Sequence, residues 1–159
     1  MSRTNTIKKH GWRVLTAGVA LSLSTLAPAA GVEFVPYVGK REATLVRVDA
    51  PDRIVVTFDS DMVGFVRTLA IKVPGIVVAQ DTPRADECER AAAKRAMSFT
   101  EKFLADAKKI YVQDVRMTNA ADDDGVSPIL TDKGSLSAAL IKEGIARPDT
   151  VDPDTPWCK

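Results

Sequence analysis

The 159 residues include one histidine, and this residue, His10, lies in a basic stretch near the N-terminus. A Ser-His-Asp triad, a histidine general base and a histidine-ligated metal are therefore excluded from the rest of the chain. The two cysteines are too few for a disulfide-rich miniature scaffold or a four-cysteine zinc site. No apolar run reaches the roughly 20 residues that a membrane-spanning helix needs.

What is present is typical of one globular domain: 45% hydrophobic and 27% charged residues. The first 29 residues have the three parts of a secretory signal peptide. A basic start is followed by a short apolar run at residues 14–27 and by small residues around Pro28. We expect cleavage after Ala29, and export to the periplasm or the medium.

Cleavage would remove four of the 22 basic residues and none of the 21 acidic ones, which leaves a net charge of −3. A basic footprint is typical of proteins that bind nucleic acid, so nucleic-acid binding is not expected. Cys88 and Cys158 would both lie in an oxidising compartment. We expect them to form a disulfide; the alternative is two unpaired thiols.

The apolar pattern predicts strands at residues 43–49, 53–59 and 65–73, followed by a Pro74-Gly75 turn and a short apolar stretch. It then predicts an amphipathic helix, capped by Thr82 with Pro83 in its first turn, that runs to about Ala107. A fourth strand at residues 110–115 is followed by a polar, acidic turn at 119–125, a fifth strand at 127–131 and a small helix at 135–143. The order of three strands, helix, two strands, helix indicates a five-stranded OB-type barrel of the α+β class.

These patterns divide the chain into four parts. Residues 1–29 are the signal peptide, and residues 30–42 a lead-in. Residues 43–147 form the barrel domain, and residues 148–159 are a proline-rich tail that a disulfide would hold in place.

Several segments resemble the staphylococcal-type thermonucleases, especially their exported proteobacterial members. Residues 132–146, DKGSLSAALIKEGIA, are similar to that family's Asp-Gly-x-x-Leu…Ala-Leu-Ile…Gly-Leu-Ala segment. Residues 99–110 resemble its long helix with the strand that follows, and residues 43–58 its first hairpin. The Trp157-Cys158 ending resembles the terminus of exported members. The resemblance covers roughly residues 43–158 and implies an OB-fold.

The resemblance also implies a phosphodiesterase that uses one Ca²⁺ held by carboxylates. In that family a glutamate activates the attacking water, and two arginines stabilise charge on the phosphoryl group. The family's first metal loop is Asp-Gly-Asp-Thr, where this chain has Ala50-Pro51-Asp52-Arg53. One carboxylate, Asp52, is kept, and Arg53 brings a positive charge beside it.

The family's second block, Arg-x-x-x-x-Asp-Thr-Pro-Glu, aligns in two registers. One register places Lys72 at the arginine, Val77 at the metal aspartate and Gln80 at the glutamate. The other keeps Asp81 as the metal aspartate after an insertion and replaces the glutamate by Arg84. Neither register keeps the glutamate that activates water.

The strand arginine is recovered only if Arg67 moves into its place. Arg67 lies five residues before Lys72, and an odd shift faces the opposite side of a strand. At the position of the second arginine this chain has Asp124, within a run of three aspartates, residues 122–124.

The sequence therefore predicts an exported thermonuclease-like OB-fold protein without catalysis, which acts as a binding or structural module, with no cofactor. We expect a monomer, and no ligand or partner is indicated. The alternative is a weak or altered Ca²⁺-dependent phosphodiesterase that cleaves DNA or RNA. Its metal ligands would be Asp52 and Asp81, with Glu87 or Glu89.

Overall fold

A computed structural model of the chain describes residues 34–61, 64–119, 121–152 and 155–157. These residues belong to one unit, Gly31–Lys159. The expected signal peptide, its cleavage point at Ala29, and Cys158 lie outside the described residues, so these predictions stay predictions.

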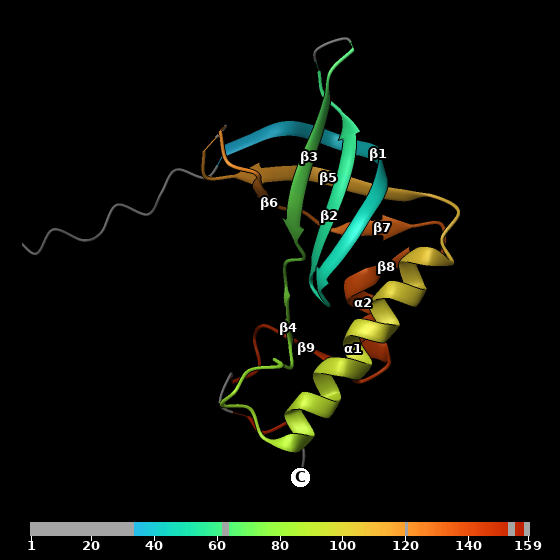
Figure 1. Ribbon diagram of the computed structural model, residues 1–159. Coiled ribbons are helices and arrows are strands. Elements are labelled where there is room, and N and C mark those ends of the chain that lie inside the picture. Colours follow the sequence, from blue (N-terminus) through green and yellow to red (C-terminus); the bar gives the residue numbers. More distant parts are fainter. Residues whose placement is uncertain (1–33, 62–63, 120, 153–154, 158–159) are drawn as a thin grey trace, which may run out of the picture. The chain divides into compact units, whose positions relative to one another are not determined.

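The described chain forms two helices and a set of strands of very different lengths (Figure 1). Their bounds are β1 Phe34–Ala50, β2 Arg53–Asp59, β3 Val66–Lys72, β4 Ile76–Val78, α1 Glu87–Ala105, β5 Ile110–Met117, β6 Asp124–Val126, β7 Ile129–Thr131, β8 Gly134–Ser135, α2 Leu136–Lys142 and β9 Ala146–Pro148.

Five of the strands close into a barrel in the order β1-β2-β3-β6-β5, with β5 pairing back to β1. β7 and β8 extend from β5, and β4 and β9 form a separate two-stranded ribbon. The closed five-stranded barrel with two helices confirms the predicted fold class. The element order differs in detail, because β4 precedes α1 and the last barrel strand is the short β6.

β1 is much longer than the predicted strand, since it begins at Phe34, within the predicted lead-in of residues 30–42. Its first part pairs with β5 and its second part with β2, so one strand serves two neighbours. Bulges between Tyr37 and Lys40 and between Leu45 and Arg47 interrupt the register and bend the strand. These irregularities break the simple alternation, which is why the pattern predicted only the second part.

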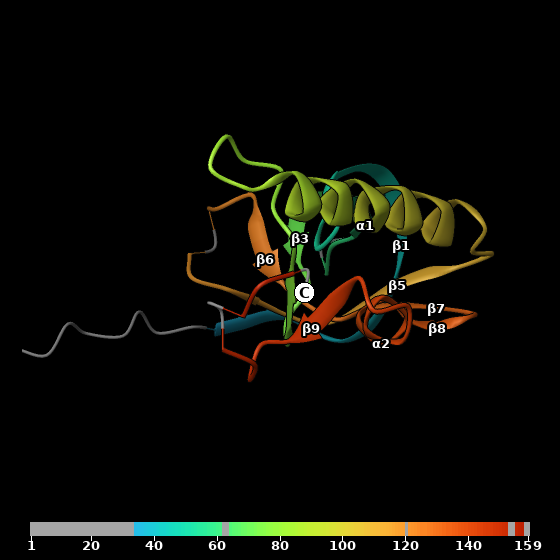
Figure 2. The same ribbon diagram turned by 90° about the horizontal axis from the view of Figure 1, so that it is seen from below.

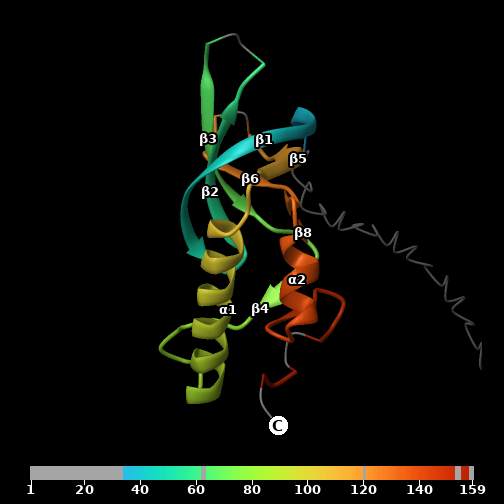
Figure 3. The same cartoon turned by 90° about the vertical axis from the view of Figure 1, so that its right-hand side faces the viewer.

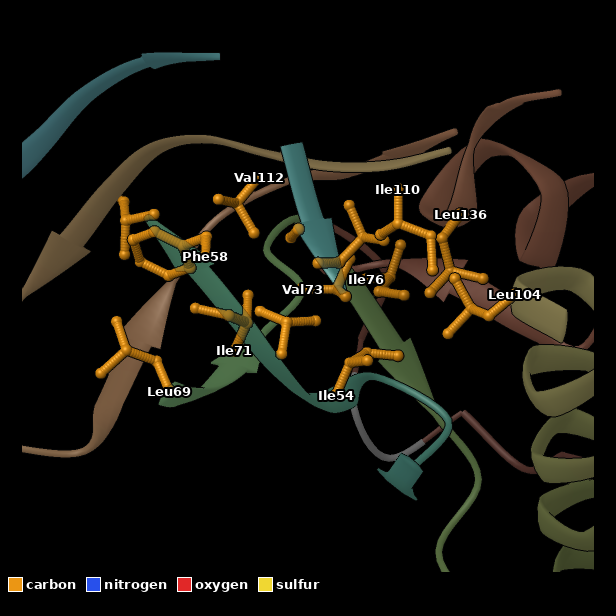
Figure 4. Packing of buried hydrophobic residues seen from close by; sticks show 14 of the residues in the cluster. Ile54, Phe58, Leu69, Ile71, Val73, Ile76, Leu104, Ile110, Val112 and Leu136 are labelled. Atoms are coloured by element: carbon orange, nitrogen blue, oxygen red, sulfur yellow. The ribbon is translucent and has the colours of Figure 1, made fainter. Parts of the chain in front are cut away.

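The barrel interior is filled by side chains at alternate positions of the strands, as the period of two requires (Figure 4). Ile54, Leu69, Ile71 and Val112 are fully buried there. Leu104 from α1 and Leu136 from α2 pack against the same cluster and close one end of the barrel.

α1 and α2 lie side by side at the barrel end opposite the β2–β3 hairpin (Figures 1 and 3). The predicted cap of α1 was wrong. Asp86, not Thr82, caps the helix, and its Oδ1 accepts a hydrogen bond of 2.7 Å from the N–H of Glu89. The Asp86-x-x-Glu89 spacing is an N-terminal helix signal that outweighs the Thr-Pro pair. Thr82 instead accepts the N–H of Ala85 in the turn before the helix.

The end of the chain returns to the ribbon side of the barrel, where β9 pairs with β4 (Figure 2). Gly144, just past α2, has a φ of +68°, which explains why glycine ends this helix. The Arg147 guanidinium donates to the carbonyl oxygens of Thr155 (2.7 Å) and Pro156 (2.6 Å) and lies 4.1 Å from the Trp157 ring centre. Arg147 thus binds residues 155–157 of the tail, for which the sequence predicts no regular structure.

Among the described residues, neither helix is long and apolar enough to cross a membrane.

Candidate functional site

Residues aligned with thermonuclease catalytic positions come together where β3 and β6 meet to close the barrel. We call this line of contact, Ala70–Lys72 against Asp124–Val126, the β3–β6 seam. Arg53, the first residue of β2, pairs in register with Lys72 at the end of β3. Asp124 lies opposite Ala70 on the far side of β3, and Asp52 directly precedes β2. The fold therefore gathers four residues selected from the sequence.

Asp52 is a buried carboxylate held by this chain's own groups. Its side chain is 4% exposed, and it forms an ion pair with the ammonium group of Lys72, which is about half exposed. Its backbone carbonyl oxygen accepts the N–H of Val73 at 2.8 Å. The hydroxyl of Thr100 in α1 donates to the carbonyl oxygen of Pro51 at 3.0 Å. The turn is fixed from β3 and from α1, and its carboxylate faces a lysine.

A second ion pair crosses β3 from β2 to β6. The guanidinium of Arg53 donates to Oδ1 of Asp124, and both side chains are partly exposed. Beside this pair lies a shallow hollow of about 200 Å³, whose rim includes Lys72, Arg116 and Asp122. The hollow thus combines cations and carboxylates, and Arg53 and Asp124 neutralise one another.

The aspartate run at residues 122–124 is bound to the barrel by two arginines. Asp124 forms an ion pair with Arg53. Nη2 of Arg67, in β3, lies 3.5 Å from Oδ1 of Asp123. Arg67 also donates to the backbone carbonyl oxygen of Asp122. In the sequence the odd strand shift argues against a role for Arg67, and no spacing signal links Arg67 to an aspartate 55 or more residues away.

The residues at the aligned metal loop do not fit a Ca²⁺ ion. Ca²⁺ takes six to eight oxygen ligands. Asp52 is occupied by Lys72, and Ala50 offers no side-chain oxygen. Val77, aligned with the second metal carboxylate in one register, lies in β4 opposite Arg147. No group of three or more histidine, cysteine, aspartate or glutamate side chains within the described ranges is arranged to hold a metal ion.

Gln80 and Asp81 line a different hollow, of about 310 Å³, between the β1–β2 turn and α1. The side-chain amide of Gln80 donates to the carbonyl oxygen of Val78 at 3.2 Å, and its backbone N–H donates to Glu89 at 3.3 Å. Arg84 is exposed in the turn before α1. Glu89 therefore accepts a hydrogen bond from the backbone of Gln80, and the side chain of Gln80 is bound to the last residue of β4.

Comparison with protein-family models and with curated proteins finds no match to this chain.

Proposed function

We propose that the protein is an exported, thermonuclease-like OB-fold protein that lacks thermonuclease catalysis and acts as a binding or structural module. One observation carries the proposal: charges at the aligned catalytic positions are paired with each other, Asp52 with Lys72 and Arg53 with Asp124. In that family, the groups at these positions would hold a metal or a phosphate. In this chain, the side chains at the same positions pair with one another and link strands.

The energetics of these pairs oppose catalysis. A divalent cation at Asp52 would have to displace Lys72 from a carboxylate that is almost fully buried, and would then lie beside Arg53. A phosphate at the second arginine position would meet the carboxylate of Asp124. Loss of one electrostatic stabiliser commonly costs 10²- to 10³-fold in rate. Several aligned positions are changed together in this chain.

The competing proposal is a weak Ca²⁺-dependent phosphodiesterase that uses Asp52 and Asp81. A digestion assay with purified mature protein decides between the two. We expect no cleavage of plasmid DNA or RNA in Ca²⁺ above a buffer blank, and no heat of tight Ca²⁺ binding by calorimetry. Catalysis is established instead if digestion requires Ca²⁺, stops in chelator and is lost in the Asp52→Ala variant. That variant separates the protein's own activity from a contaminating nuclease.

Export forms part of the proposal and rests on the signal-peptide pattern of residues 1–29. We expect the exported protein to begin at Ala30 or within two residues of it, as measured by intact mass. Exported protein that still carries residues 1–29 would contradict this prediction.

The proposed disulfide between Cys88 and Cys158 gains support from packing near α1. Trp157, the residue before Cys158, packs against Ala79, Ala92 and Ala93. Ala92 lies four residues after Cys88, on the same side of the helix. Peptide mapping without reductant should recover the two cysteines in one linked pair. Full alkylation of both thiols in oxidised protein would show that the pair does not form.

A further inference from the structure

β3 has one edge that is only partly covered. The whole strand pairs with β2, from Val66 opposite Asp59 to Lys72 opposite Arg53. On its other side β6 pairs with Ala70–Lys72. Between Val66 and Leu69, no strand in the described part of the chain covers this side. We call this segment the free β3 edge.

The free β3 edge presents backbone groups in a defined direction. The N–H of Ala70 donates to Asp123 at 2.7 Å, and the carbonyl oxygen of Lys72 accepts from Ser127 at 3.2 Å, both away from β2. In an antiparallel pair, alternate residues direct both backbone groups to the same side. Thr68 and Val66 therefore continue this row, with two N–H groups and two carbonyl oxygens directed outward.

Apolar side chains accompany this row of backbone groups. Phe65 is 62% exposed and Val66 is 65% exposed, among the most exposed large apolar residues described. A hollow of about 390 Å³ runs along the same edge and over the outer face of the sheet. Its lining includes Arg47, Val55, Val66, Thr68, Ala70 and Asp123. The hairpin that carries the edge stands out beyond the barrel (Figure 1).

We propose that the free β3 edge docks an extended segment of another protein, which adds one strand beside Val66 and Thr68. Main-chain hydrogen bonds to the four outward backbone groups would supply the affinity. Because side chains alternate along a strand, every second residue of the partner would face the hollow beside Val55 and Ala70. The partner is thus an extended peptide, and β-branched or aromatic residues at alternate positions would favour the strand conformation that it must adopt.

A second copy of this chain fits the edge poorly. β6 occupies the same side of β3 from Ala70 onward. An antiparallel second copy would bring its own β6, with the loop around Asp123, against the hairpin end at Phe65. A short segment from another protein meets no such obstruction. The edge also favours a peptide over a sugar or nucleic acid, because a peptide backbone repeats its donors and acceptors at strand spacing.

This inference gives the proposed binding role a partner class and rests on that role. The two can fail separately. Ca²⁺-dependent digestion that is lost in Asp52→Ala would overturn the proposed function and leave the free β3 edge unaffected. Failure of peptide binding would overturn the edge proposal and would not restore catalysis.

The test starts from random linear peptides displayed on phage and selected on immobilised mature protein. Enriched peptides are then synthesised and followed by hydrogen–deuterium exchange. With peptide at about 100 times its Kd, we expect exchange at the amides of Val66 and Thr68 to slow by roughly 100-fold. N-methylation of the peptide amides that face β3 should abolish binding, and N-methylation of the alternate amides should not.

Protein variants locate the site. Val66→Lys places a charge on the edge and should weaken binding at least about tenfold. Val38→Lys is the matched control, because Val38 is 69% exposed but lies on β1. Thr68→Pro removes one outward donor, and circular dichroism checks that each variant folds. The proposal is overturned if no peptide is enriched or if Val66→Lys binds as well as Val38→Lys. It is equally overturned if sedimentation shows a dimer that Val66→Lys dissociates.

Discussion

The barrel is closed by two lines of strand contact that are built differently. Along the first, β1 and β5 pair from Phe34 opposite Met117 to Ala43 opposite Ile110. The second, the β3–β6 seam, has three register positions. Ion pairs reinforce that short seam: Arg53 with Asp124 across β3, and Arg67 with Asp123. Where few backbone contacts are available, charged side chains supply additional links.

The difference gives the charged residues at the short seam a structural meaning. The line of contact that closes this barrel with few backbone pairings carries charged residues that attract one another. Asp52 with Lys72 and Arg53 with Asp124 hold β2, β3 and β6 together.

The largest expected effect comes from removing the partner of the buried carboxylate. Lys72→Met removes the ion-pair partner of the Asp52 carboxylate, whose side chain is 4% exposed. We expect the free energy of unfolding to fall by about 2–3 kcal/mol, somewhat below the value for a fully buried pair because Lys72 is half exposed. Urea denaturation measures it. The double variant Lys72→Met/Asp52→Asn should recover part of the loss, and a loss below about 1 kcal/mol would show that the pair is dispensable.

The next effect tests how closely the short seam is packed. Gly125 of β6 has no room for a side chain: an added Cβ would lie 2.9 Å from Cγ1 of Val115 and 3.3 Å from Cδ1 of Ile71. Gly125→Ala should therefore lower the free energy of unfolding by about 1–2 kcal/mol.

A double-mutant cycle identifies the cause of that loss. If the contact with Val115 is responsible, adding Val115→Ala to Gly125→Ala costs less than the two single variants predict by addition. Strict additivity would show that the seam adjusts without strain.

Two exposed ion pairs then compare the two lines of contact directly. Arg53→Met removes a pair from the short seam, where we expect a loss of up to about 1 kcal/mol. Lys109→Met removes the 2.8 Å pair with Glu42 beside the β1–β5 line, where the loss should be smaller. Equal losses by urea denaturation would show that the short seam does not depend more on its charges.

The smallest effect depends on pH. Desolvation opposes ionisation of Asp132, but the backbone N–H groups of Lys108 and Lys109 lower its pKa overall, below the ordinary 3.8. The folded state therefore favours the carboxylate, and this stabilisation is complete above 3.8 and is lost as the pH falls through the lowered pKa. Asp132→Asn should be less stable than wild type near neutral pH, and the difference should shrink below pH 3.8. A difference that stays constant with pH would exclude the ionised carboxylate as its source.

Sequence patterns predict the elements whose side chains alternate regularly. β2 lies at its predicted bounds, because Ile54, Val56 and Phe58 face the core without interruption. The first part of β1 was missed because bulges shift its register. β6 lies partly inside the predicted acidic turn, because a three-residue strand that begins with Asp124 carries no strand signal.

The sequence indicated some of the charged residues that the fold brings together. Alignment with the thermonuclease pattern selected Asp52, Lys72 and Asp124; Lys72 and Asp124 lie on the β3–β6 seam, and Asp52 forms an ion pair with Lys72. Which charge pairs with which could not be predicted. Arg53 and Asp124 are 71 residues apart, and only the closed barrel places them side by side. Gln80 and Asp81, selected by the same pattern, line a separate hollow.

The β4–β9 ribbon can form only long after β4 has been synthesised, because its two strands are far apart in the sequence. Ile76 pairs with Pro148 and Val78 with Ala146, so the ribbon joins two segments about 70 residues apart in the sequence. A chain that emerges from a ribosome or a translocation channel N-terminus first has β4 exposed while α1, the rest of the barrel and α2 are still to come. Ile76 and Val78 gain their strand partner only after residues 146–148 have been made, about 70 residues later.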